Sequence, residues 1–104
     1  MKAARIVGPH RFEVLDVPGH SAGHLAFWRE ADRVLVLGDV VNNVNVRTGI
    51  SGLHEPQEIF TADPALNRES ARRLAELEPA LACFGHGPPL RNPRKLSEFA
   101  ASLP

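Results

Sequence analysis

Residues 17–24 read VPGHSAGH, which ends an apolar run in a bend marked by proline and glycine. Two later stretches repeat this pattern: GDV at residues 38–40 and FGHGPP at residues 84–89. Each bend presents one side chain that can bind a metal ion, namely His20, Asp39 and His86. Two imidazoles and one carboxylate are typical ligands of zinc and similar ions. These three residues are therefore the candidate metal ligands.

The composition describes a small chain without net charge. Its 104 residues predict one domain over residues 1–104. Twelve Lys and Arg residues balance twelve Asp and Glu residues, so charge gives no reason to expect nucleic acid or a membrane as partner. One cysteine excludes an intrachain disulfide and fits a reducing compartment. Residues 1–11 lack the apolar run of a signal peptide, so we expect a cytoplasmic protein.

The apolar pattern predicts strands that lead into and out of these bends. They are expected at residues 12–17, 25–29, 33–37 and 81–84, and residues 3–7 are either a short strand or a frayed end. The unbroken apolar run at residues 34–37 is typical of a strand covered on both faces of its sheet. Residues 40–61 have the composition of a long loop but carry apolar side chains, so we expect them to pack over a site.

Two helices are predicted from their capping residues. Asp63-Pro64 and Asn92-Pro93 each place a capping side chain before a proline at the first helical position. The expected buried stripe of the first helix is Leu66, Ser70, Leu74 and Leu77, and that of the second is Leu96, Phe99, Ala100 and Leu103. This order of elements predicts a layered α/β fold, a sheet with helices on at least one face.

The three bends, their order and the helix between the second and third resemble the C-terminal half of a metallo-β-lactamase-fold hydrolase. Glyoxalase II and the lactonases belong to that superfamily. The resemblance runs from about Phe12 to the end of the chain. It implies half of an αββα sandwich, with a mixed sheet and helices on one face.

The resemblance also implies roles for the three candidate ligands. His20 would bind one metal and His86 the other, while Asp39 would bridge both and act as the catalytic residue. Zinc is implied first, with iron or manganese as alternatives, in one or two ions. A water or hydroxide between the metals would attack an ester, thioester, lactam or phosphoester in a small-molecule substrate.

The sequence departs from the family in one large respect. It lacks the His-x-His-x-Asp-His run, and its other histidines, His10, His24 and His54, form no such pattern. Each metal would then have two protein ligands, one of them shared, where three are typical of a catalytic zinc ion. Half a sandwich would also expose an apolar sheet face, so we expect a two-fold homodimer or a complementary half-domain as partner.

Two functional classes follow. The first is a metal-dependent hydrolase that is competent as an oligomer or with a second half. The second is a non-catalytic remnant or interaction subunit of the same ancestry. A third interpretation, an unrelated α/β ligand-binding domain, would make the three motifs coincidental.

Several residues also have simpler roles to weigh. His20 could hydrogen-bond its own turn, Asp39 could cap a turn, and His86 could face solvent. His24 is expected to support the loop beside a metal ligand. Cys83 is expected to be a small buried apolar residue, and His54 a surface histidine.

Overall fold

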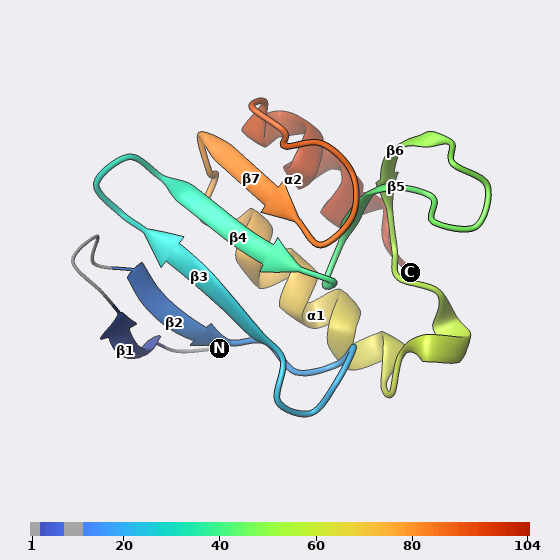
Figure 1. Ribbon diagram of the computed structural model, residues 1–104, viewed down its shortest axis with the longest axis horizontal. Helices are drawn as coiled ribbons and strands as arrows, with labels where there is room; N and C mark the ends of the chain where they lie inside the picture. The colour runs from blue at the N-terminus through green and yellow to red at the C-terminus, as the bar shows by residue number, and fades with distance from the viewer. Residues whose placement is uncertain (1–2, 8–11) are drawn as a thin grey trace.

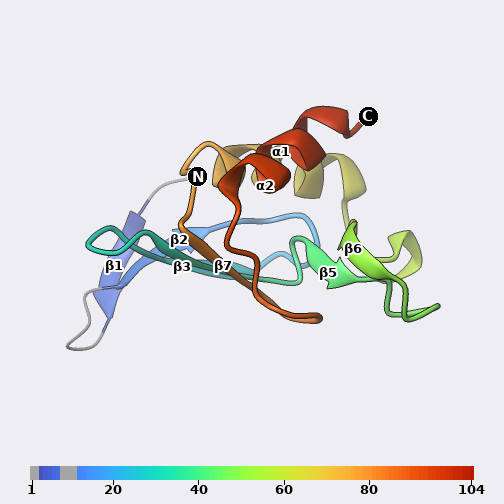
Figure 2. The same cartoon turned by 90° about the horizontal axis from the view of Figure 1, so that it is seen from above.

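A five-stranded mixed sheet with two helices on one of its faces makes up most of the computed structural model, which describes residues 3–7 and 12–104 (Figures 1 and 2). The strands of the sheet are β1 (Ala3–Val7), β2 (Phe12–Asp16), β3 (Leu25–Arg29), β4 (Val34–Gly38) and β7 (Leu81–Phe84). They lie in the order β1-β2-β3-β4-β7; β7 runs parallel to β4, and every other neighbouring pair is antiparallel. The four predicted strands are confirmed, and residues 3–7 form a strand and not a frayed end.

The strand register separates the two faces of the sheet. Trp28 lies beside Leu35, and Leu35 beside Ala82, and all three side chains are buried on the helix side. Because side chains alternate along a strand, the next row over, Phe27 and Val36, points to the opposite face. The core therefore lies between the sheet and the two helices.

The helices begin where the capping residues predict. Helix α1 spans Pro64–Ala75, and its cap Asp63 accepts a hydrogen bond of 3.0 Å from the amide of Leu66. Helix α2 spans Pro93–Ser102, and its cap Asn92 accepts one of 3.0 Å from the amide of Arg94. These side chains satisfy amide groups that a helix start leaves without partners.

The buried stripe predicted for α1 is wrong at one position. Leu66 is 36% exposed, and the buried positions of α1 are Asn67, Ser70, Ala71, Leu74 and Ala75. Asn67 replaces Leu66 because its amide group donates a hydrogen bond of 3.0 Å to the carbonyl of Val40. Helix α1 therefore presents Asn67, and not Leu66, to the loop after β4. A hydropathy pattern does not predict this orientation, because it places polar residues on the exposed side of a helix.

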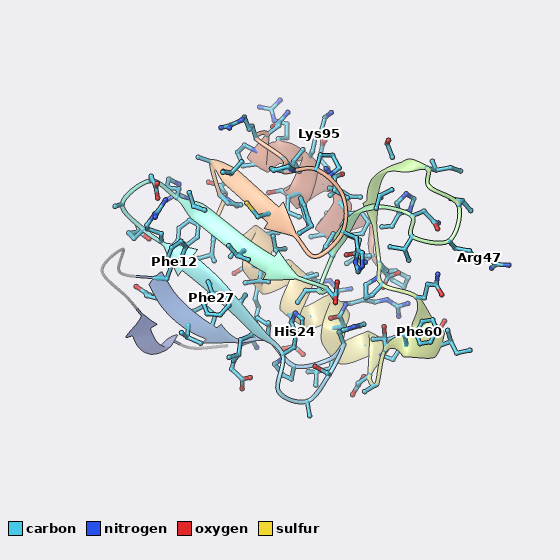
Figure 3. All side chains as sticks on the ribbon, in the orientation of Figure 1. Phe12, His24, Phe27, Arg47, Phe60 and Lys95 are labelled. Atoms are coloured by element: carbon cyan, nitrogen blue, oxygen red, sulfur yellow. The ribbon has the colours of Figure 1, made fainter. Side chains whose placement is uncertain are left out.

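The second face of the sheet has no covering layer in the described part of the chain. Figure 2 shows both helices on the other side, and Figure 3 shows Phe12 and Phe27 on this open face. The expectation that residues 34–37 are covered on both faces is wrong here: Val34 and Val36 are half-buried. Cys83, expected to be buried, is half-buried on the same face.

Residues 40–61, predicted as a loop, contain regular structure. A hairpin of β5 (Asn42–Val44) and β6 (Ser51–His54) is followed by the short 3-10 helix η1 (Glu58–Phe60). The side chain of Asn45 accepts hydrogen bonds from the amides of Arg47 and Thr48 and shapes the hairpin turn. The hairpin lies beside the end of the main sheet (Figure 1).

Neither helix in the described residues combines the length and the apolar character that crossing a membrane requires. His10 lies outside the described residues.

Candidate metal centre

The three bends meet at one edge of the sheet because of its topology. Strands β4 and β7 are parallel, so the residues after them, Asp39 and His86, emerge at the same edge. Strand β3 is antiparallel to β4 and therefore starts at that edge, which is where the loop carrying His20 ends. Figure 1 shows these three connections together at the arrowheads of β4 and β7.

The carboxylate of Asp39 lies between the two imidazoles. Its Oδ2 is 3.9 Å from Nε2 of His20, and its Oδ1 is 3.1 Å from Nδ1 of His86. All three side chains line one hollow of about 200 Å³. The structure thus brings together the three residues that the sequence singles out.

The donor set and its surroundings fit a cation. Asp39 Oδ1 is buried and receives no hydrogen bond, since the ring of His86 is close to it without donating along a hydrogen-bond direction. A buried carboxylate oxygen without a donor favours a positive charge beside it. Two ligands of one tetrahedral zinc ion lie about 3.4 Å apart, and Nε2 of His20 and Oδ2 of Asp39 are 3.9 Å apart.

The three side chains do not form a complete metal site by themselves. Among residues 3–7 and 12–104, no group of three or more His, Cys, Asp or Glu side chains is arranged to hold a metal ion. The two imidazoles instead face different oxygens of the same carboxylate.

Gly85 makes room for this carboxylate. An added Cβ at Gly85 would collide with Asp39 Oδ1 and would lie 3.0 Å from Asp39 Cγ. The amide of Gly85 also donates a hydrogen bond of 2.8 Å to the carbonyl of Gly38. The glycine before His86 therefore lets the backbone pass directly beside Asp39.

His24 connects the bend of His20 to the bend of Asp39. Its Nε2 lies 3.2 Å from the backbone amide of Asp39 and 3.2 Å from the carbonyl of Leu37. Gly38 adopts φ +64° over this ring, and a Cβ there would lie 2.7 Å from Nε2. The expectation that His24 supports the loop is confirmed by these contacts.

Two buried asparagines hold the His86 bend, and sequence reasoning missed both. Asn42 Oδ1 lies 3.3 Å from Nδ1 of His86. Asn43 donates through its side chain to the carbonyl of Pro88 at 2.8 Å and through its backbone to the carbonyl of His86 at 3.0 Å. Their polar character suggested a loop, and only their position close after Asp39 could have linked them to the site.

The rest of the hollow is lined by residues 40–61, the segment predicted to pack over a site. Val46, Pro56 and Phe60 line it together with Gln57. Phe60 is 70% exposed and Val46 is 48% exposed, so both present apolar surface next to the charged residues. Figure 3 shows Phe60 at the outer end of this wall.

Two ion pairs away from this hollow shift the pKa values of their own members. Arg29 donates two hydrogen bonds of 2.7 Å to Asp32, which hold the pKa of that carboxyl below its usual value and raise that of Arg29. A hydrogen bond of 2.7 Å from Arg68 to Glu55 raises the pKa of Arg68.

His54, expected on the surface, is half-buried, and its Nε2 is buried without a hydrogen-bond partner.

Comparison with known sequences identifies the relatives of this chain. The family described as the metallo-beta-lactamase superfamily matches residues 2–86. The chain is 40% identical over 79 residues to the probable metallo-hydrolase YflN of Bacillus subtilis, covering 70% of this chain and 30% of that protein. It is 31% identical over 72 residues to a hydroxyacylglutathione hydrolase of Bdellovibrio bacteriovorus, covering 69% of this chain and 25% of that protein.

Solved structures agree with this relationship. A metallo-beta-lactamase family protein of Thermus thermophilus, TTHA1429, superposes with a TM-score of 0.68 at 26% identity, covering 97% of this chain and 33% of that one. A second protein, TTHA1623, whose crystal structure is of a di-iron-bound form, superposes with a TM-score of 0.61 at 30% identity. That match covers 88% of this chain and 41% of TTHA1623. The chain spans between a quarter and a third of the length of the two curated relatives.

Proposed function

Because the chain belongs to the metallo-β-lactamase superfamily, we propose that it forms the part of a metal-dependent hydrolase that holds His20, Asp39 and His86 around two ions. One observation carries this proposal: each oxygen of one carboxylate faces a different imidazole inside a single hollow. The substrate is proposed to be an ester, thioester or lactone. The names metallo-hydrolase and hydroxyacylglutathione hydrolase among its relatives support that reaction class.

Each residue has a distinct part in this proposal. His20 and His86 would each bind one ion, and Asp39 would bind both. Zinc suits this donor set best, with iron or manganese as alternatives. When bound, the ions supply acidification of a water molecule and polarisation of the substrate oxygen. Val46 and Phe60 would hold the apolar part of the substrate against the open side of the centre.

The partner is proposed to be a second copy of the chain packed on the open sheet face. Phe27, Val36 and Cys83 present a half-buried, largely apolar row there, and such surfaces are typical of interfaces. Sheets that pack face to face lie about 10 Å apart and bury such rows between them. A second layer could also add the ligands that the ions lack; a complementary half-domain would serve the same purpose.

The metal proposal is tested by elemental analysis of Asp39→Asn beside a matched control, Asp16→Asn, which changes an exposed carboxylate of β2. We expect Asp39→Asn to lose the metal and thioester hydrolysis, and the control to keep both. Equal metal content in both variants would contradict the proposal. A metal-free assembled protein would favour the alternative, a non-catalytic interaction subunit.

The partner proposal is tested by light scattering on Val36→Asp beside Arg47→Asp, which places a carboxylate on the exposed hairpin turn. A dimer is expected for the parent chain and for Arg47→Asp, and a monomer for Val36→Asp. A monomeric parent chain at micromolar concentration would refute the second copy as partner.

A further inference from the structure

The segment between β6 and α1 reaches the metal centre through two successive hydrogen bonds. The hydroxyl of Thr61, a residue only 8% exposed, donates to the carbonyl of Gln57 at 2.8 Å. Nδ1 of His20 lies 3.3 Å from the same hydroxyl oxygen. A carbonyl can only accept, so the single hydroxyl hydrogen is committed to Gln57. The oxygen of Thr61 is left to accept a hydrogen from the imidazole.

This pattern determines which nitrogen of neutral His20 carries the hydrogen. Nδ1 must donate to Thr61, so Nε2 keeps a free lone pair. Nε2 is also the nitrogen on the side of Asp39, 3.9 Å from Oδ2. A metal binds the bare nitrogen of a histidine, and the other ring nitrogen commonly donates to an outer partner.

We propose that Thr61 is a positioning residue, which fixes the tautomer of His20 so that Nε2 faces Asp39 and the centre. This inference rests on the proposed function and deepens it by assigning one side chain outside the ligand set. It also connects the wall of the hollow to the ligands, because Gln57 belongs to that wall.

The backbone around Thr61 is held independently of its hydroxyl. The amide of Ala62 donates to the carbonyl of His20 at 3.2 Å, and the amide of Asp63 donates to that of Gly19 at 2.8 Å. The amide of Thr61 itself donates to the carbonyl of Glu58 at 3.1 Å. Removing the hydroxyl should therefore change which nitrogen of His20 carries the hydrogen and leave the backbone conformation unchanged.

The experiment compares Thr61→Val, Thr61→Ser and the parent chain. Valine keeps the shape and removes the acceptor, whereas serine keeps the acceptor. Thr48→Val is the matched control, because Thr48 is exposed in the hairpin turn. The tautomer of His20 is read by NMR from the nitrogen shifts of the metal-free, labelled protein, which also distinguish neutral from charged rings.

We expect hydrogen on Nδ1 of His20 in the parent chain, Thr61→Ser and Thr48→Val. In Thr61→Val we expect a shift toward hydrogen on Nε2, the form that a free histidine side chain prefers. Hydrogen on Nε2 in the parent chain, or no change in Thr61→Val, would overturn the inference.

Zinc binding gives a second readout that separates this inference from the proposed function. Thr61→Val should weaken zinc affinity about 10- to 100-fold, and Thr61→Ser should restore it. If the tautomer changes as expected but no variant binds zinc, the proposed function fails and the effect of Thr61 on His20 stands. Equal zinc affinity in the parent chain and Thr61→Val would overturn the positioning role.

Discussion

Replacing Gly85 with alanine should damage the metal centre far more than the fold. Gly85 has no positive φ, so alanine can adopt its backbone conformation. The new methyl group would collide with Asp39 Oδ1 and lie 3.0 Å from Asp39 Cγ and 3.2 Å from the carbonyl carbon of Gly38. The backbone of Gly85 is held by the hydrogen bond from its amide to the carbonyl of Gly38, so the carboxylate of Asp39 is the group that can move. It would have to move by about 1 Å to reach van der Waals contact with the new methyl group.

The expected magnitudes follow from that displacement. Metal–ligand distances tolerate only about 0.2 Å, so a carboxylate pushed from its place binds the proposed ions in a strained position. Zinc affinity should fall about 100-fold, at the upper end of what disturbing a site's supporting residues costs. Because the clash involves the end of a side chain, the free energy of unfolding should fall by only about 1 kcal/mol, at the low end of overpacking costs.

Competition for zinc with a chromophoric chelator measures the affinity, and thermal unfolding of the metal-free protein measures the stability. A loss of 1 kcal/mol corresponds to about 4–8 °C in Tm for a domain of this size. Gly23→Ala is the matched control, because a Cβ there meets nothing within 4 Å. Equal zinc affinity in both variants would refute the placement of Asp39, and complete unfolding of Gly85→Ala would refute the estimate of its cost.

Three further predictions concern the fold. Leu74→Ala, at a fully buried position under the sheet, should lower the free energy of unfolding by about 2–5 kcal/mol in urea titration, and a cost under about 1 kcal/mol would contradict the core described here. Asp63→Ala should cost about 1 kcal/mol in the same assay because α1 loses its cap, and no cost would contradict that role. The lowered pKa of Asp32 means that its pair with Arg29 stabilises the fold above about pH 4, and that this stabilisation is lost as the pH falls through the lowered value. Acid titration should therefore destabilise the parent chain more than Asp32→Asn, and identical profiles would contradict this.

The elements with a local cause could be predicted from the sequence. Asp63-Pro64 and Asn92-Pro93 define helix starts through their own side chains, and the apolar runs define the strands. The meeting of the three bends also follows from strand direction, once β7 is placed parallel to β4. These features depend on residues close in sequence or on the topology of one sheet.

The features that were missed depend on distant partners. Asn42 and Asn67 are buried because each finds a hydrogen-bond partner elsewhere, at His86 and at the carbonyl of Val40. The role of Thr61 depends on His20, 41 positions earlier in the chain. Polarity alone assigns such residues to loops or surfaces, because the partner that compensates their burial lies outside any local window.

The metal content of the freshly purified chain, measured together with that of Asp39→Asn, tests the central claim most directly. We predict stoichiometric zinc, iron or manganese in the parent chain and its loss in the variant, since Asp39 is the proposed ligand of both ions. A parent chain free of metal, or a variant that keeps the same metal content, would contradict it.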